Sequence, residues 1–289
     1  MKYGIFYAYW EKEWKGDFIT YIEKVKKLGF DILEVGCGDF HKQPDSYFHT
    51  LRDAAREYDI ILTGGYGPRA EHNLCSPDTA VVENALAFYS DIFRKMEIAG
   101  IRSIGGGLYA YWPVDYSREP DKAGDLERSI KNMRRLADIA ERHGITLNME
   151  VLNRFEGYLI NDTNEGLAYI RAVDKPNVKL MLDTFHMNIE EDSLIEPILQ
   201  AGKYLGHVHV GEPNRKPPRE GRIPWGEIGK ALRQIGYDGP VVMEPFVTMG
   251  GQVGKDIRIW RDLSQGATES DLDRDAAQSL AFLKRAFEA

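Results

Sequence analysis

The sequence predicts an α/β protein that folds as a (β/α)₈ barrel of the TIM type, with residues 1–289 as one domain. Three observations predict this fold. Short apolar runs alternate eight times with stretches of helical spacing, polar residues gather where the apolar runs end, and the length is 289 residues. Such barrels need about 250 residues. An open doubly wound sheet is the alternative for this alternation, but eight βα units favour closure into a barrel.

The expected strands are short runs rich in β-branched and other apolar residues. They cover residues 3–8, 31–36, 60–65, 101–106, 145–151, 178–182, 205–210 and 240–244. The expected helices lie between them, where apolar residues recur every three or four positions. They cover residues 16–28, 46–57, 78–99, 120–143, 163–173, 192–202, 225–235 and 271–287. We therefore expect eight strands and eight helices in strict alternation.

Turn residues support several of these boundaries. Gly29, Gly144 and Gly236 each follow an expected helix and precede an expected strand, where a left-handed cap is favoured. Ser76-Pro77-Asp78 reads as the start of the third helix, with a capping residue followed by a proline in the first turn. The sequence shows no linker or low-complexity segment that would divide the chain.

Polar segments follow the expected strands, whereas the segments after the helices are short and lack chemical signals. The polar segments are residues 7–10, 65–73, 109–113, 150–156, 183–188, 209–222 and the stretch from 244 onward. In a barrel the loops after the strands meet at one face, which carries the active site. We therefore expect any site at this face.

Two glycine clusters lie close to that face. Residues 64–67 read Gly-Gly-Tyr-Gly, and residues 105–107 are three successive glycines. Neither has the G-x-G-x-x-G spacing of a dinucleotide site or the acidic residue that follows it. We expect the backbone to approach a ligand or a bulky neighbour here, in preference to cradling a phosphate.

Composition excludes several classes of protein. Apolar residues make up 43% and charged residues 28%, with a formal net charge of −8, so the chain lacks the basic character of a nucleic-acid-binding protein. Charged residues at 11–13 interrupt the first apolar run, so we expect neither a signal peptide nor a membrane span. Cys37 and Cys75 form no CxxC motif and read as reduced thiols, which predicts a cytoplasmic protein.

Four successive expected strands end in a possible metal ligand, namely Glu150, Asp183, His209 and Glu244. A single carboxylate at a strand end is usually a helix cap or a surface charge, but four in succession predict one divalent cation at the barrel mouth. Three carboxylates and an imidazole suit Mn²⁺, Co²⁺ or Mg²⁺ better than a structural zinc. His207 lies one layer deeper on the same face. We expect it to be a packed, hydrogen-bonded barrel residue.

This donor set suits proton transfer at a carbon beside a carbonyl. Such chemistry needs a positioned base and a cation that stabilises the developing enediolate oxygen. Glu150 and Glu244 come from the two ends of the arc of ligands, so we expect them to face each other across the cation. Inverting a stereocentre on a ketose would use both carboxylates. An aldose–ketose isomerisation would use the same groups on one face.

At these residues the chain closely resembles the D-tagatose 3-epimerase/D-psicose (D-allulose) 3-epimerase family, within the xylose-isomerase-like barrels. The resemblance runs nearly end to end. The matching runs are Y-A-Y-W (7–10), N-L-C-S-P-D (73–78), Y-W-P-V-D-Y (111–116), E-V-L-N-R-F-E (150–156), M-L-D-T-F-H-M-N-I-E-E (181–191), G-R-I-P-W (221–225) and V-M-E-P-F (242–246). Runs of this length are far more specific than a barrel with a few carboxylates.

The resemblance implies a metal-dependent interconversion of D-fructose and D-psicose, with D-tagatose and D-sorbose as further substrates. It implies one Mn²⁺ or Co²⁺ per subunit on the four ligands above, and transfer of the C3 proton between Glu150 and Glu244 through a cis-enediolate. Contacts with the ketohexose would come from Glu156, His186 and Arg215 around C1 to C3, and from Phe6, Trp112 and Phe246 along the pocket. A homodimer or homotetramer is also implied.

Each substrate contact has a plainer structural reading. Glu156 and Arg215 could be solvent-exposed loop charges, Trp112 a packing residue at the barrel rim, and Phe6 and Phe246 ordinary core. Three positions depart from the family pattern. They are Phe6, where many relatives carry tyrosine, Gly107, where alanine is common, and Tyr66, at a variable site. These departures affect the preferred ketohexose and leave the chemistry intact.

Three other functions are alternatives on the same barrel. An aldose–ketose or hydroxypyruvate-type isomerase would give an aldose from D-fructose. A metal-dependent endonuclease would need more histidine ligands and a basic rim, against seven histidines in total and a net charge of −8. A non-catalytic sugar-binding barrel would tolerate the loss of the Glu244 carboxylate.

Overall fold

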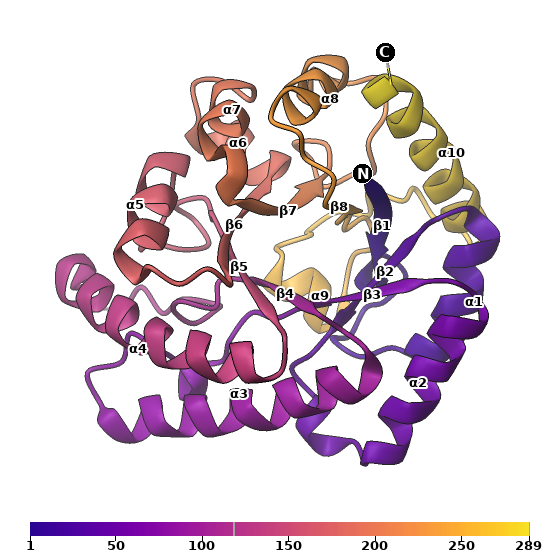
Figure 1. The fold of residues 1–289 in the computed structure, drawn as a ribbon. Helices are drawn as coiled ribbons and strands as arrows, with labels where there is room; N and C mark the ends of the chain where they lie inside the picture. Colours follow the sequence, from indigo (N-terminus) through magenta and orange to yellow (C-terminus); the bar gives the residue numbers. More distant parts are fainter. Residues whose placement is uncertain (118, 289) are drawn as a thin grey trace.

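Eight parallel strands close into a barrel in the order of the sequence, from β1 through β8 and back to β1. The computed structural model describes residues 1–117 and 119–288. The strands are β1 (Lys2–Phe6), β2 (Ile32–Gly36), β3 (Ile61–Gly65), β4 (Ser103–Gly106), β5 (Thr146–Glu150), β6 (Val178–Asp183), β7 (Leu205–Val210) and β8 (Pro240–Met243). Figure 1 looks into this barrel, with the helices around it. The prediction of a (β/α)₈ barrel is confirmed.

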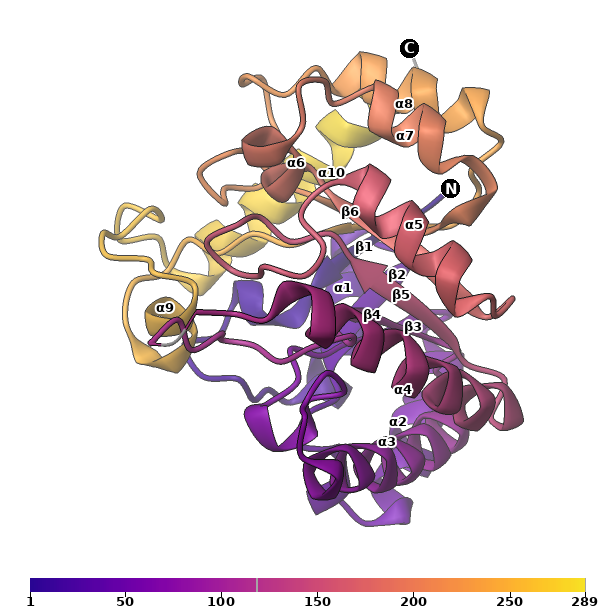
Figure 2. The same ribbon diagram turned by 90° about the vertical axis from the view of Figure 1, so that its left-hand side faces the viewer.

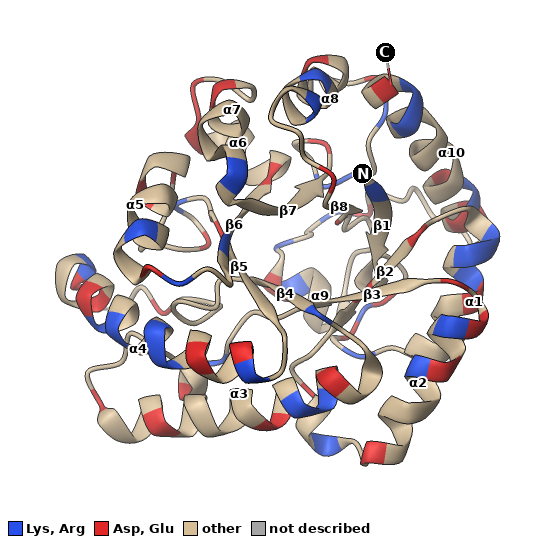
Figure 3. Ribbon diagram, viewed as in Figure 1, with Lys and Arg blue, Asp and Glu red and all other residues tan. Residues whose placement is uncertain are grey.

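Helices follow the strands in turn, and most of them form an outer ring around the barrel. They are α1 (Phe18–Leu28), α2 (Asp45–Glu57), α3 (Thr79–Ala99), α4 (Lys122–Arg142), α5 (Thr163–Val173), α6 (Thr184–Glu190), α7 (Glu196–Ala201), α8 (Trp225–Gln234), α9 (Gly251–Asp256) and α10 (Glu269–Glu288). Short 3₁₀ turns lie at η1 (Tyr7–Tyr9), η2 (Phe40–Lys42), η3 (Ala70–His72) and η4 (Gly202–Tyr204). Acidic and basic residues are interspersed along these helices (Figure 3).

Two helices depart from the expected one-to-one alternation. Helix α6 starts directly after β6, and its seven residues are too few to show a helical period. Helix α9 contains two glycines, which are poor helix formers, so its sequence carries no helical signal. In the side view of Figure 2, α9 lies apart from the outer ring on a long connection after β8. Both helices belong to the loops after strands.

The expected caps agree with the structure at most positions. Gly29, Gly144 and Gly236 have φ angles of 90°, 64° and 68°, which is the left-handed conformation that glycine adopts without a Cβ clash. The start of α3 differs from the prediction, because Asp78 is the capping residue and accepts a hydrogen bond from the backbone N–H of Ala80 at 2.8 Å. The cap therefore follows the proline.

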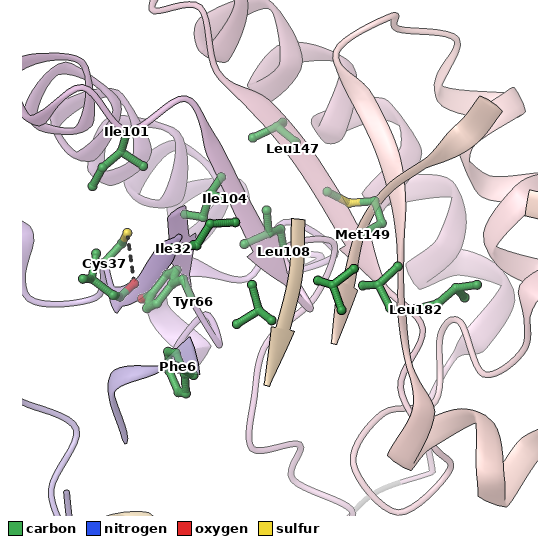
Figure 4. Packing of buried hydrophobic residues seen from close by; sticks show 14 of the residues in the cluster. Phe6, Ile32, Cys37, Tyr66, Ile101, Ile104, Leu108, Leu147, Met149 and Leu182 are labelled. Carbon is green, nitrogen blue, oxygen red and sulfur yellow. Dashed lines mark hydrogen bonds between the residues drawn. The ribbon is translucent and has the colours of Figure 1, made fainter. Parts of the chain in front are cut away.

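The space between the strands and helices is filled by a continuous apolar core. Figure 4 shows part of it, with Leu147 and Met149 on one strand and Leu182 on the next. Cys37 and Cys75 are buried free thiols, as predicted. No helix within the described residues is both long and apolar enough to cross a membrane.

The glycine clusters allow bulky neighbours to pack against the barrel backbone. A Cβ on Gly105 would lie 2.5 Å from the Met181 sulfur, and one on Gly106 would lie 2.3 Å from the backbone oxygen of Tyr66. The expectation of a bulky neighbour is therefore confirmed at Gly105, whereas at Gly106 the close neighbour is the backbone of Tyr66.

Candidate metal and active site

A cavity of about 350 Å³ is formed at the carboxyl ends of the strands. Polar residues of the expected site line it together with aromatic residues. The polar set is Glu150, Glu156, His186, His209, Arg215 and Glu244, and the aromatic set includes Phe6, Trp14, Tyr66, Trp112 and Phe246. The structure therefore brings the sequence-predicted substrate contacts to one cavity, and Asp183 lies beside it as a member of the ligand cluster.

The four predicted metal ligands form one cluster. Each of Glu150, Asp183, His209 and Glu244 offers one ligand atom, and these atoms all lie within 4.8 Å of one another. Glu150 and Asp183 are the last residues of β5 and β6, His209 lies in β7, and Glu244 directly follows β8. The strand register sets Asp183 opposite His209. The ends of these four strands thus bring the four candidate ligand atoms close together.

The cluster has the chemistry of a divalent cation site. The Nδ1 atom of His209 is buried and has no hydrogen-bond partner among the described residues. It lies 3.4 Å from a Glu244 oxygen and 3.9 Å from a Glu150 oxygen. An imidazole nitrogen among three carboxylates is a donor set that Mn²⁺, Co²⁺ and Mg²⁺ accept. A cation would therefore satisfy the unpartnered nitrogen and neutralise the carboxylates.

Asp183 is both a helix cap and a member of the cluster. Its Oδ1 atom accepts a hydrogen bond from the backbone N–H of Phe185 at 2.9 Å, which caps α6. Its Oδ2 atom accepts one from the Arg215 guanidinium at 3.1 Å. The cap holds the carboxylate in place, and the second oxygen is turned toward the cluster. Asp183 therefore caps a helix and also belongs to the cluster of candidate ligands.

Glu150 and Glu244 differ in their tendency to hold a proton. Burial raises the pKa of Glu150, and the nearby Glu244 carboxylate adds to this, more than His186 and His209 lower it. Burial would also raise the pKa of Glu244, but His209 and Arg215 outweigh it and lower that pKa. Two carboxyl groups whose environments separate their pKa values are suited to donor and acceptor roles in proton transfer.

Arg215 is buried among carboxylates and is not a solvent-exposed loop charge. Its guanidinium donates to Asp183 at 3.1 Å and to Glu244 at 3.0 Å, and lies 3.4 Å from Glu156. The guanidinium carbon sits 3.7 Å from the centre of the Phe185 ring, which fixes its plane. Arg215 has a φ of 64° in the loop between β7 and α8. Such strained residues cluster at functional sites.

His186 is fixed by a residue that the sequence did not indicate. Its Nδ1 atom receives hydrogen bonds from the Asn153 backbone N–H at 3.2 Å and from the Asn153 side-chain amide at 2.7 Å. Because both partners are donors, Nδ1 must be an acceptor, so Nε2 carries the proton. Nε2 lies 3.6 Å from a Glu150 oxygen. Asn153 thus presents an N–H of His186 toward the cluster.

Aromatic rings form the other wall of the cavity. Phe6 at the end of β1 lies 6.2 Å from Phe246 between ring centres. Trp14, which the sequence analysis did not single out, packs edge-on against Trp112 and Phe246, at 5.9 and 6.1 Å. Its indole N–H donates to Asp256 of α9 at 2.8 Å. The site therefore has a charged side and an apolar side.

Three further positions from the sequence analysis, Gly107, Tyr66 and His207, also lie in or near the site. Gly107 and Tyr66 line the cavity, and the Tyr66 hydroxyl pairs with His72 at 2.6 Å. His207 is fully buried, as expected. Its Nε2 atom lies 3.1 Å from a Glu34 oxygen, but neither ring nitrogen has hydrogen-bond geometry with a described residue. His207 is therefore packed inside the barrel as expected, with the Glu34 carboxylate as its close polar contact.

Glu34 is a further buried charge that the sequence analysis missed. It lies in β2 with 1% exposure, and its Oε1 atom is 2.6 Å from Nε2 of His209. The signal was present in the sequence, because Ile-Leu-Glu-Val-Gly places one carboxylate inside an apolar strand. Such a residue is almost never fully buried without a partner.

Known proteins resemble this chain over its whole length. The model of the xylose isomerase-like TIM barrel family matches residues 22–286. D-psicose 3-epimerase of Ruminiclostridium cellulolyticum is 54% identical, over 100% of this chain and 98% of its own. A crystal structure of D-psicose 3-epimerase from Clostridium cellulolyticum with D-tagatose is 54% identical, covers all of both chains and has a TM-score of 0.99. One determined in the presence of D-fructose is 50% identical over both full chains, with a TM-score of 0.98.

Proposed function

We infer that this chain, which belongs to the D-tagatose/D-psicose 3-epimerase family of xylose isomerase-like TIM barrels, interconverts D-fructose and D-psicose. The chain is thus an isomerase, a ketose 3-epimerase. The observation that carries the proposed chemistry is the meeting of two carboxylates, Glu150 and Glu244, in one ligand cluster at the cavity. The relatives crystallised with D-tagatose and with D-fructose support both sugars as substrates, and we add D-sorbose.

The proposed cofactor is one Mn²⁺ or Co²⁺ per subunit, with Mg²⁺ as a third candidate. Glu150, Asp183, His209 and Glu244 would hold it, since they supply three carboxylates and one imidazole without a thiolate. The chemistry that such a cation supplies is polarisation of the carbonyl group and stabilisation of negative charge on oxygen. The oxygen-rich donor set supports this choice.

The proton steps fall to the two glutamates. One carboxylate removes the C3 proton, so the C3–H bond breaks and its electron pair moves toward the C2 oxygen, giving a cis-enediolate. The other glutamate, which enters the step protonated, gives its proton to C3 on the opposite face and becomes a carboxylate, so the centre is inverted. The reverse reaction exchanges the two roles. General acid–base catalysis of this kind contributes about 10²–10⁴-fold to a rate.

The polar residues around the two glutamates would orient the sugar. Arg215 and Glu156 supply donors and acceptors on one side, and the Nε2–H of His186 supplies a donor beside Glu150. Trp112, Phe246 and Phe6 would pack against the carbon skeleton away from C3. The division of the cavity into a charged and an apolar side supports this orientation of the sugar.

A direct assay tests the proposed function. The chain is stripped of metal with a chelator and incubated with D-fructose, with and without added Mn²⁺ or Co²⁺, and the products are separated by chromatography. We expect D-psicose only when the metal is present. Glucose or mannose as the product would instead indicate an aldose–ketose isomerase. Failure to convert D-fructose with any of these metals would contradict the proposal.

Changing Asn153 to aspartate is expected to raise the KM for D-fructose about tenfold with a smaller change in kcat, because one misplaced substrate hydrogen bond costs about 1–2 kcal/mol. The substitution replaces the amide donor that faces Nδ1 of His186 by an acceptor. Steady-state kinetics measure the effect. Asn177→Asp is the control, because the Asn177 amide donates to the carbonyls of Ala137 and Ile145 and does not line the cavity. Equal KM values for the two variants would contradict the assigned role of Asn153.

Changing Phe6 to tyrosine is expected to widen the spread of kcat/KM among D-fructose, D-psicose, D-tagatose and D-sorbose, by roughly tenfold. A hydroxyl on this buried ring would add a polar group to the apolar side of the cavity. A site that hydrogen-bonds one sugar hydroxyl discriminates against sugars that place it elsewhere. The four values of kcat/KM measure this, and a spread unchanged within twofold would contradict it.

A further inference from the structure

Beneath the proposed metal ligands lies a second, deeper group of polar side chains inside the barrel. Glu34, Thr63 and His207 come from β2, β3 and β7 and are each at most 2% exposed, and Glu34 contacts the proposed ligand His209. A carboxylate at this depth is costly unless its oxygens are fully paired. The contacts of Glu34 therefore indicate what it does for its neighbours.

Both oxygens of Glu34 are engaged. Oε2 accepts a hydrogen bond from the Thr63 hydroxyl at 2.8 Å and lies 3.1 Å from Nε2 of His207. Oε1 lies 2.6 Å from Nε2 of His209. Oε2 already accepts from the Thr63 hydroxyl, and in the 2.6 Å contact at Oε1 the carboxylate oxygen is again the acceptor. Nε2 of His209 therefore carries a proton and donates it.

This contact determines which nitrogen of His209 is free. With the proton on Nε2, the lone pair of the neutral ring lies on Nδ1, which is the nitrogen near Glu150 and Glu244. The hydrogen bond also fixes the rotation of the ring, because Nε2 is held from below. Carboxylate partners of ligating histidines have this effect in metal sites generally.

We propose that Glu34 is a positioning residue of the metal site, which holds His209 in the Nε2–H tautomer so that Nδ1 faces the cation. The inference rests on the proposed function, because it assumes a cation on the four ligands. Glu34 itself need not touch the cation or the sugar. Thr63 in turn holds Oε2, the oxygen of Glu34 that does not contact His209.

The same residues also suggest a different arrangement, in which Glu34, His207 and His209 would themselves hold an ion. The short contact between Glu34 and His209 favours the positioning role, because Nε2 cannot donate a proton to Glu34 and bind a metal at once. The number of ions bound per chain separates the two arrangements. One ion supports the positioning role, and a second ion that needs Glu34 overturns it.

The test compares Mn²⁺ binding to the metal-stripped full chain with binding to three variants, by isothermal titration calorimetry. The variants are Glu34→Leu, Glu34→Gln and Thr63→Val. Loss of the carboxylate in Glu34→Leu is expected to weaken Mn²⁺ binding about 10–100-fold. Glutamine keeps an oxygen that can accept from His209 but loses the negative charge, so Glu34→Gln should weaken Mn²⁺ binding about three- to tenfold, less than leucine. Thr63→Val removes a hydrogen bond that does not involve His209 and should stay within about threefold of wild type.

A spectroscopic measurement complements the affinities. The visible absorption spectrum of Co²⁺ bound to the chain reports the arrangement of its ligands, and it should change in Glu34→Leu and remain unchanged in Thr63→Val. A merely structural role for Glu34 would lower the melting temperature without changing this spectrum. Circular dichroism melts identify any variant that fails to fold. Should Glu34→Leu fail to fold, a several-fold loss of Mn²⁺ affinity in Glu34→Gln still supports the proposal.

The metal-binding measurements distinguish a wrong inference about Glu34 from a wrong proposed function. If the wild-type chain binds no Mn²⁺ or Co²⁺, the proposed function is wrong. If the wild type binds Mn²⁺ and Glu34→Leu or a folded Glu34→Gln binds it within twofold as tightly, Glu34 does not position His209 and the inference is overturned.

Discussion

Replacing Glu244 by glutamine is expected to abolish epimerisation while D-fructose still binds. Glutamine has nearly the shape of glutamate but cannot accept and return the C3 proton, so we expect kcat to fall by about 10³-fold or more. Arg215 and Glu156, the proposed sugar contacts, remain in place. Turnover is measured by chromatography of D-psicose, and binding by quenching of tryptophan fluorescence, since Trp14 and Trp112 line the cavity.

Glu212→Gln is the matched control for this substitution. Glu212 is also a buried glutamate on a loop after a strand, and it accepts from the Trp225 indole at 3.0 Å. A glutamine oxygen can accept the same bond, so activity should stay near that of wild type. The metal content of each variant must be measured, because Glu244 is also a proposed ligand. A metal-loaded Glu244→Gln that turns over at more than a tenth of the wild-type rate would contradict the two-glutamate scheme.

The two glutamates also predict an asymmetry between variants. A variant that keeps only one of the two glutamates still has a base on one face of the sugar. In deuterated water it can exchange the C3 hydrogen for deuterium only in the epimer whose C3 hydrogen faces that base. Glu150→Gln and Glu244→Gln should therefore exchange opposite members of the D-fructose and D-psicose pair, and neither should interconvert them. Exchange of the same epimer by both variants would show that a single face is used.

Replacing Asp183 by asparagine is expected to weaken Mn²⁺ binding at least about 100-fold and to reduce kcat/KM accordingly at limiting metal. The amide oxygen can still accept the hydrogen bond from Phe185 that caps α6, so the helix should be kept. The negative charge that the cation requires is lost, and carboxylates are the preferred ligands of Mn²⁺ and Mg²⁺. Calorimetric titration of the metal-stripped chain with Mn²⁺ measures the effect.

Asp162→Asn provides the control for the cap. Asp162 caps α5 by accepting from the backbone N–H of Glu165 at 2.7 Å, and it is not one of the clustered ligands. Its substitution should leave Mn²⁺ affinity within about twofold, since asparagine is as good a capping residue as aspartate. If Asp162→Asn and Asp183→Asn changed the affinity equally, Asp183 would act as a cap alone.

The barrel and its cluster of candidate metal ligands could be predicted because their signals in the sequence are local and periodic. Each of β5 to β8 is an apolar run that ends in one polar ligand, and parallel strands bring such ends to the same face. The strand register then places Asp183 opposite His209. The position of each candidate ligand therefore follows from the order of the strands and from the geometry of a closed sheet.

Other parts of the site depend on contacts between distant segments and could not be predicted. Trp14 lies at the cavity, where Asp256 of α9, 242 residues away in the chain, accepts its indole N–H. Asn153 acts through His186, 33 residues later in the chain. Helix α6 was missed because it is too short to be periodic. Glu34 gave a signal, a charge in an apolar strand, but its partner His209 lies 175 residues away.

The most direct test of the two-glutamate reaction is the fate of the C3 hydrogen. The metal-loaded chain is incubated with D-fructose in deuterated water, and the recovered ketoses are examined by nuclear magnetic resonance. Removal of the proton by one carboxylate and return by the other predicts deuterium at C3 of D-psicose. D-Psicose formed without solvent deuterium at C3, or deuterium at C1 together with an aldose, would contradict it.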